Sequence, residues 1–257
     1  MIELRKLGCR IGGNVALHSV TAAFSAGSII GVIGPEGSGK TTLLKLISGM
    51  IRRFEGEIVI NGRLLASLGR RELPRLVSSC LDSLPENTEI SLAEFLRFAR
   101  VPLKGFLAPL TAYDMQVAEE HQTFFGLADL GSETLASLPG SALKKALIAF
   151  ALIRQAPVLV MDNPSAGLDL RSTVLLQRSI ARYAFDGERS VIMASHDLNF
   201  VAQTADCIYL MKEGTLSPEI PPEALDAAFV KKHFNTEVLV SRNIYNGRPE
   251  FHFFPEP

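Results

Sequence analysis

The segment from Gly34 to Thr42 combines the residue types that bind phosphate. Its sequence, GPEGSGKTT, matches G-x-x-x-x-G-K-[ST] and follows the apolar run SIIGVI. Glycines let backbone N–H groups converge on phosphate oxygens, and the N-terminus of a following helix adds its positive dipole end. We expect Lys40 to reach the outer phosphates and the Thr41 hydroxyl to bind Mg²⁺. An ordinary glycine-rich turn is the alternative, but the register of Lys40 and Thr41 favours a nucleotide site. The predicted nucleotide-binding residues are Gly34, Pro35, Glu36, Gly37, Ser38, Gly39, Lys40, Thr41 and Thr42.

A second group of candidate residues lies in VLVMDNPSAGLD, residues 158–169. Asp162 ends an apolar run about 120 positions after Lys40. Alone, an aspartate at a strand end is more often a turn residue or a helix cap. Beside a phosphate loop it is better interpreted as a metal ligand, acting with Thr41 from the tip of an adjacent strand. The next residue, Asn163, has a neutral amide that cannot accept a proton as a general base.

The elements that must position these residues alternate between strands and helices. We expect apolar strands at 28–34, 157–162, 190–197 and 206–214, and helices at 40–47, stopping at Gly49, and near 171–184. Such alternation with apolar strands predicts an α/β fold with a mostly parallel sheet covered by helices. Residues from about 84 to 155 are rich in Leu, Ala and Glu at helical spacing, which indicates a helical block inserted into that pattern.

Composition narrows the class of protein. Lys+Arg is 26 and Asp+Glu is 27, so the chain lacks the basic excess of a non-specific nucleic-acid binder. Two local clusters, Arg52–Arg53 and Arg70–Arg71 with Arg75, are interpreted as a solvated face. No run of about 18 apolar residues and no signal-peptide core occur. Three widely spaced cysteines predict no disulfide framework. We therefore expect a cytoplasmic protein, which could still dock on a membrane protein.

The order of these motifs resembles the ATP-binding subunit of ABC transporters, over nearly the whole chain. The segment LPGSALKKALIAFAL, residues 138–152, is similar to the family's LSGG-type signature and the helix after it. Asp169, in SAGLD, looks like the D-loop aspartate. His196, in VIMASHDL, looks like the switch histidine that senses the γ-phosphate, although a lone histidine at a strand end is usually structural. The signature positions are Leu138, Pro139, Gly140, Ser141 and Ala142.

The resemblance implies a P-loop NTPase core of ABC type with an antiparallel β subdomain and an inserted α-helical subdomain at approximately 84–155. Residues 1–257 would form a single domain that ends in a tail segment at approximately 215–257. ATP and Mg²⁺ are the implied cofactors. Two subunits of this family sandwich two ATP molecules head to tail, each site using one chain's P-loop and the other's signature.

The resemblance also implies partners and a location. The pair of subunits would act on an integral membrane permease, from the inner face of the cell membrane, and no nucleic acid would be bound. The segments ISLAEFLRFARVP, HDLNFVAQTADCIYLMKEG and FNTEVLVSRNIYNGRPEFHFFP look like importers of the iron-siderophore, haem and cobalamin type.

Four departures from the family pattern surround the expected nucleotide. Asn163 stands at the position of the catalytic glutamate. In the signature, Pro139 replaces a serine and Ser141 replaces the second glycine; proline still allows a helix to start there. The Q-loop glutamine falls near Asp82, and the aromatic that stacks on adenine falls on Ile11.

Together these departures predict a subunit that keeps nucleotide binding and has weakened turnover, so its status as an ATPase stays open. In a homodimer, each composite site would contain both Asn163 and Pro139. In a pair with a subunit that has the family's glutamate and signature, each site would contain only one of these departures. A heterodimer is therefore suspected. The alternative is a nucleotide-responsive regulatory or structural subunit of a complex without transport. A repair or translation protein of the family is disfavoured by the neutral charge and the single cassette.

Overall fold

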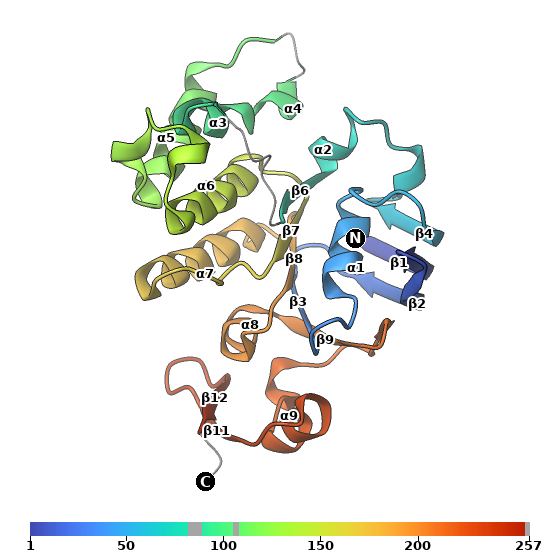
Figure 1. The fold of residues 1–257 in the computed structure, drawn as a ribbon. Helices are drawn as coiled ribbons and strands as arrows, with labels where there is room; N and C mark the ends of the chain where they lie inside the picture. Colours follow the sequence, from blue (N-terminus) through green and yellow to red (C-terminus); the bar gives the residue numbers. More distant parts are fainter. Residues whose placement is uncertain (82–88, 105–107, 255–257) are drawn as a thin grey trace.

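The computed structural model describes residues 1–81, 89–104 and 108–254. Its centre is a six-stranded sheet in the order β10-β9-β3-β8-β7-β6, in which β9 through β6 are parallel and β10 is antiparallel (Figure 1). The expected strands are present, and every residue of three of them is buried, as a sheet covered on both faces requires. The strands are β3 (Ile29–Ile33), β6 (Val77–Cys80), β7 (Val158–Asp162), β8 (Ser190–Ala194), β9 (Cys207–Lys212) and β10 (Thr215–Leu216).

Helices follow several of these strands and lie on both faces of the sheet. The predicted helix after β3 is α1 (Lys40–Ile47), and the one after β7 is α7 (Leu170–Ala184). Between β8 and β9 lies α8 (Leu198–Thr204). α1 ends at Ile47, with Ser48 as its C-cap and Gly49, with φ of 71°, after it, as the sequence predicts. The α/β fold expected from strand–helix alternation is confirmed.

A second sheet, of four strands in the order β2-β1-β4-β5, is antiparallel and packs on the α1 side of the molecule. β1 and β2 form a hairpin whose turn, Gly12–Gly13, has positive φ at both residues, which glycine adopts without steric cost. The strands are β1 (Ile2–Ile11), β2 (Asn14–Phe24), β4 (Glu55–Ile60) and β5 (Arg63–Leu64). This sheet is the antiparallel β part expected from the resemblance.

The helical block connects two neighbouring strands of the central sheet, β6 and β7. Two of its helices begin with a capping box, at Ser91 and at Thr111. The block contains α3 (Leu92–Phe98), α4 (Val101–Lys104), α5 (Ala112–Phe124), η2 (Ala128–Leu130), η3 (Leu135–Ser137) and α6 (Gly140–Ile153). The connection between β5 and β6 contains η1 (Leu65–Ser67) and α2 (Leu73–Leu76).

The C-terminal segment packs on α8. Asn199 of α8 exchanges two hydrogen bonds with the backbone of Phe251, at 2.9 and 2.7 Å. The segment contains η4 (Pro222–Ala224), α9 (Ala227–Phe234) and the hairpin of β11 (Val238–Arg242) and β12 (Pro249–Phe253). In the described part of the chain, no helix is both long enough and apolar enough to cross a membrane.

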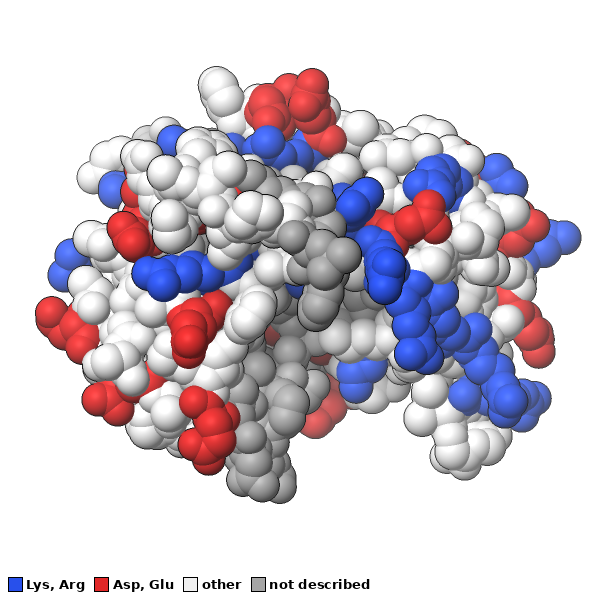
Figure 2. Space-filling model, turned by 90° about the horizontal axis from the view of Figure 1, so that it is seen from above, with Lys and Arg blue, Asp and Glu red and all other residues white. Residues whose placement is uncertain are grey.

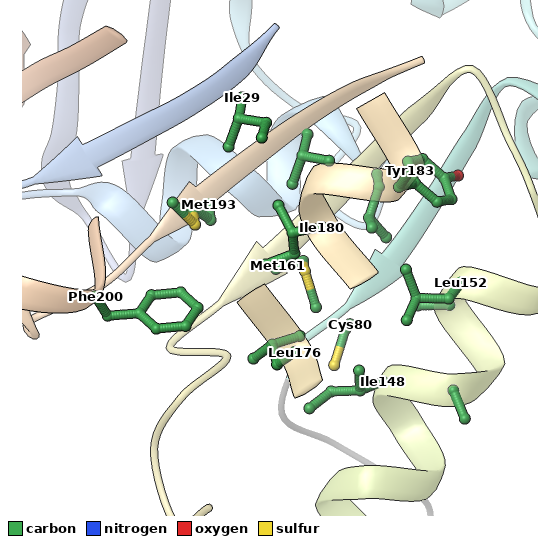
Figure 3. Close-up of a cluster of buried hydrophobic side chains, with 14 of the residues drawn as sticks. Ile29, Cys80, Ile148, Leu152, Met161, Leu176, Ile180, Tyr183, Met193 and Phe200 are labelled. Atoms are coloured by element: carbon green, nitrogen blue, oxygen red, sulfur yellow. The ribbon is translucent and has the colours of Figure 1, made fainter. Parts of the chain in front are cut away.

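Alternate residues of the central strands contribute to two separate cores. Val160 and Ile192 face α1 and the antiparallel sheet. Met161 and Met193 face the other side, where Figure 3 shows them beside Ile180 of α7. This packing on both faces fixes the ends of β3, β7 and β8, where the candidate site residues lie.

One expectation about strand order is wrong. The strand that ends in Asp162 was expected beside the strand of the phosphate loop, but β8 lies between β7 and β3. Strand order depends on long-range packing, which the apolar pattern of each strand does not record. The carboxyl ends of all three strands still meet at one edge of the sheet.

Candidate functional site

The phosphate loop connects β3 to α1 and takes a conformation that requires glycine at two positions. Gly34 has φ of 151°, and a Cβ there would lie 2.0 Å from the carbonyl oxygen of Met211. Gly39 has φ of 108°, and its Cβ would lie 2.7 Å from the carbonyl oxygen of Ala16. The loop is therefore held between β9 and the β1–β2 hairpin, with its backbone close to both.

Gly39 is also the N-cap of α1, where no side chain caps the helix. The first N–H groups of a helix lack intrahelical partners, and together with the helix dipole they attract anions. A backbone cradle that a Cβ would fill, leading into an uncapped helix N-terminus, fits the phosphate groups of a nucleotide.

Lys40, the first residue of α1, is 5% exposed and folds back over the loop. Its Nζ donates to the carbonyl oxygens of Gly34 (2.8 Å) and Pro35 (2.7 Å). Burial lowers the pKa of Lys40, and the nearby carboxylates of Asp162 and Glu36 raise it in part. The ammonium group is thus held at the loop, where it can neutralise phosphate charge.

Thr41 and Asp162 meet across the edge of the sheet. The Thr41 hydroxyl donates to Asp162 Oδ2 at 2.7 Å, joining the start of α1 to the end of β7. Asp162 is 7% exposed, and its Oδ1 is one of the few described buried side-chain atoms without a hydrogen-bond partner. Mg²⁺ commonly uses one carboxylate, hydroxyl or water oxygens and substrate phosphates. A hydroxyl and an orphaned carboxylate oxygen beside a phosphate cradle fit this ion.

Asn163 and His196 also meet at this edge. The Asn163 N–H donates to the carbonyl oxygen of Ala194 (2.8 Å), and its Oδ1 accepts from the backbone N–H of His196 (3.2 Å). The Asn163 amide therefore fixes the loop after β8, which carries the exposed His196 side chain. The Asn163 amide oxygen is therefore a hydrogen-bond acceptor in this arrangement, but an amide cannot take up a proton as a general base does.

The segment expected to be the signature contains the N-terminus of α6. Pro139 occupies the N-cap position with φ of −55°, its carbonyl accepts from the N–H of Leu143 (2.9 Å), and the helix begins at Gly140. The expectation that proline permits the helix to start here is confirmed. Pro139, Gly140 and Ser141 are exposed, whereas Leu138 and Ala142 are buried below them.

Asp169 caps α7 and links it to α6. Its Oδ1 accepts from the N–H of Ser172 at 2.8 Å, and its Oδ2 lies 3.3 Å from Lys145 Nζ. The hydrogen bonds from Ser172, followed by the ammonium group of Lys145, lower the pKa of Asp169 to about 2. Lys145 was missed by the sequence analysis, because it precedes Asp169 by 24 residues and no local pattern relates them.

The remaining candidates differ in how the structure places them. Pro35, Glu36, Gly37, Ser38 and Thr42 lie in the phosphate loop and the first turn of α1. Ile11 ends β1 at the tip of the hairpin that touches the loop, and is 47% exposed. Asp82, the expected Q-loop position, lies outside the described residues.

Comparisons with known proteins all indicate the same family. A family model described as "ABC transporter" matches residues 17–166. The chain is 31% identical to the hemin import ATP-binding protein HmuV of Gloeobacter violaceus, with 97% of this chain and 92% of that protein aligned. It is 26% identical to the petrobactin import ATP-binding protein YclP of Bacillus subtilis, with 98% and 100% aligned.

The fold is similar to solved ATP-binding cassettes. One is a dimeric structure of the cassette MJ0796 in a post-hydrolysis state, bound to ADP and Pi. It superposes with a TM-score of 0.76 at 22% identity, covering 86% of this chain and 98% of that one. At this identity the similarity establishes the fold, which is the mixed α/β architecture of these cassettes.

Proposed function

This chain belongs to the ABC transporter family as an ATP-binding subunit of importer type, and we propose that it binds MgATP at the loop between β3 and α1 and couples dimer closure to a membrane permease, with weakened hydrolysis. The observation that carries the nucleotide site is the Thr41–Asp162 contact with its orphaned carboxylate oxygen, directly beside the glycine cradle. These features lie at or directly after the carboxyl ends of β3 and β7, which meet at one edge of the sheet.

Each residue would have a distinct part in nucleotide binding. The loop N–H groups from Gly34 onward would hold the phosphates, and Lys40 would neutralise the outer ones. Thr41 and Asp162 would hold Mg²⁺, which when bound neutralises phosphate charge. Ile11 would supply apolar contact to the base, without the stacking that an aromatic side chain provides.

Weakened hydrolysis is proposed from Asn163. Its amide can orient a water molecule but cannot take a proton from it. Loss of a general base typically costs about 10²- to 10⁴-fold in rate. Binding does not depend on this residue, because the phosphate and metal contacts come from Lys40, Thr41 and Asp162.

The cargo is proposed from the relatives named above, which import hemin and petrobactin. We infer that the complex containing this chain imports an iron chelate or a similar metal-containing cofactor. The contacts to such a cargo would lie in the permease and a capture protein, not in this subunit.

The test of nucleotide binding compares two lysines of α1. Lys40→Ala should reduce MgATP affinity, measured by calorimetry, by at least about 100-fold, since it removes a buried charge at the outer phosphates. Lys45→Ala is the matched control, because Lys45 lies in the last turn of the same helix, away from the loop, and should leave affinity unchanged. Equal affinity of Lys40→Ala and wild type would contradict the proposed site.

The test of transport coupling is purification of the native complex from membranes with this chain tagged. An integral membrane permease and a second ATP-binding subunit should be recovered. Recovery of a complex without a permease would instead support a regulatory or structural role.

A further inference from the structure

A surface of five arginines lies outside the candidate nucleotide site. Arg52 and Arg53 follow α1, and Arg70, Arg71 and Arg75 lie before and within α2. All five residues are exposed. We call these five residues the arginine patch. α2 belongs to the face shown in Figure 2, where Lys and Arg side chains gather in a stripe across one half of the molecule.

The two parts of the arginine patch are held together by contacts between their segments. Arg52 Nη1 donates to the carbonyl oxygen of Leu68 at 3.1 Å. A Cβ at Gly49 would lie 2.2 Å from Leu73 Cδ2, so the end of α1 packs closely on α2. The Arg75 Nε donates to the carbonyl oxygen of Pro102 (2.6 Å), which joins α2 to α4. The patch is therefore formed by two segments that contact each other, the second of which is also joined to α4.

Within the described residues, none of the five guanidinium groups of the patch forms an ion pair within 4.0 Å. The nearby Glu72 pairs with Arg63 at 2.5 Å and compensates Arg75 only at longer range. The whole chain has a net charge of −1, so the remaining surface must be net negative. An anionic surface orients a molecule with such an asymmetric distribution of charge, although the net charge of the molecule gives no overall attraction to that surface.

The chemistry of the patch fits phosphate groups. All five cations are arginines, whose planar guanidinium binds phosphate oxygens in pairs and is less strongly hydrated than an ammonium. Met50, 56% exposed, lies in the segment of Arg52 and Arg53, and Leu64, 42% exposed, ends β5 next to Arg63, whose side chain pairs with Glu72 before α2. Both are aliphatic, whereas surfaces that bind single-stranded nucleic acid usually interleave aromatic side chains for base stacking. Arginines beside exposed aliphatic side chains are typical of peripheral membrane surfaces.

From these observations we propose that the arginine patch binds the anionic phospholipid headgroups of a bilayer, and so orients this subunit on the membrane surface independently of nucleotide. The lipid contact would act in addition to the permease contact of the proposed function. It does not depend on that function, because none of the patch residues belongs to the nucleotide site.

The test is sedimentation of the purified protein with vesicles of phosphatidylcholine alone, or mixed equally with phosphatidylglycerol. Wild type should bind only the mixed vesicles at about 0.1 M salt, and lose binding at about 1 M salt, where the Debye length falls from about 10 to about 3 Å. Each arginine near an anionic surface strengthens binding about fivefold. The variant R53Q/R70Q/R71Q should therefore bind on the order of 100-fold more weakly.

The matched control is R178Q/R182Q/K232Q, which removes three exposed charges from α7 and α9. It should bind mixed vesicles as wild type does. MgATP affinity measured in parallel should be unchanged in both variants, which separates failure of this proposal from failure of the nucleotide site. The proposal is overturned if wild type does not bind mixed vesicles, if both variants lose binding equally, or if the patch binds a single-stranded RNA but not the vesicles.

Discussion

Asn163 combines an unusual backbone conformation with a specific side-chain contact. Its φ of 42° lies in the left-handed region, which asparagine and aspartate adopt more readily than other non-glycine residues. Its Oδ1 also accepts from the N–H of His196. The residue therefore suits its position structurally, although it lacks the chemistry of a base. A carboxylate introduced here must be compatible with both features.

The first prediction concerns Asn163→Asp. Aspartate tolerates a positive φ and can accept the same hydrogen bond, so the fold should be unchanged. If the missing base limits turnover, the ATPase rate of the assembled complex should rise at least about tenfold. Asn163→Glu should raise it as well, while lowering the free energy of unfolding by about 1 kcal/mol because of backbone strain. Asn163→Ala serves as the control without a carboxylate. Equal rates in all three variants would show that another step limits turnover.

The second prediction concerns Cys207, which is partly buried in β9. Burial, followed by the negative charges of Glu219 and Asp206, raises the pKa of the Cys207 thiol to about 12. A thiol must lose its proton to react, so at about pH 8 only about one molecule in 10⁴ carries the thiolate. Labelling by a maleimide should be on the order of 10³-fold slower than for an ordinary thiol, and should accelerate about tenfold per pH unit in the folded protein.

The labelling of Cys207 is followed by peptide mass spectrometry, which separates it from Cys9 and Cys80. Glu219→Gln removes one of the negative charges, so the pKa should fall and labelling at constant pH should become faster. Rapid labelling of the wild-type thiol near neutral pH would contradict the raised pKa.

At the scale of elements, the sequence predicts the structure correctly where local patterns decide it. Continuous apolar runs located β3, β7 and β8, because strands covered on both faces bury every residue. The glycine after α1 located the end of that helix. The strand before the helical block, β6, was not identified, since VSSC is short and half polar. The position of β8 between β7 and β3 and the Lys145–Asp169 pair depend on tertiary packing, which no local pattern records.

A buried ion pair holds the helical block together, and the third prediction concerns this pair. Arg100 Nε lies 3.0 Å from Asp114 Oδ1, with side chains 7% and 1% exposed. Arg100 Nη1 also donates to the carbonyl oxygen of Ile153 (3.1 Å) and to Gln155 Oε1 (2.9 Å). The pair thus joins α5, at its first turn, to the end of α6. Removing one partner leaves a buried charge without compensation.

Asp114→Ala should lower the free energy of unfolding by about 3–5 kcal/mol, measured by urea denaturation. The matched control is Glu119→Ala, from the same helix, whose pair with Arg97 is exposed at 3.6 Å and should contribute at most about 1 kcal/mol. Replacing both partners, in R100M/D114L, should recover part of the loss, since no unpaired charge remains. Equal effects of the two alanine variants would mean that the buried pair contributes no more than a surface one.

At the scale of the whole molecule, the candidate residues lie at two separate surfaces. The phosphate loop, Asp162 and Asn163 lie at the edge of the central sheet, whereas Pro139 and Ser141 lie at the start of α6. In the head-to-tail pair that we propose, these surfaces would meet only across two subunits. The departures at Asn163 and Pro139 would then lie in one composite site of a homodimer, but in different sites of a heterodimer.

This distinction gives the fourth prediction, on the coupling between two variants of the native complex. Asn163→Asp and Pro139→Ser are measured singly and together, as a double-mutant cycle on the ATPase rate. In a homodimer, both departures limit the same site, so the double variant should exceed the product of the single gains. In a heterodimer with a complete partner, the two variants act at different sites, so their gains should combine without coupling. Native mass spectrometry reports the subunit composition independently. A heterodimer whose two variants couple strongly, or a homodimer whose variants do not couple, would show that the two residues do not meet as proposed.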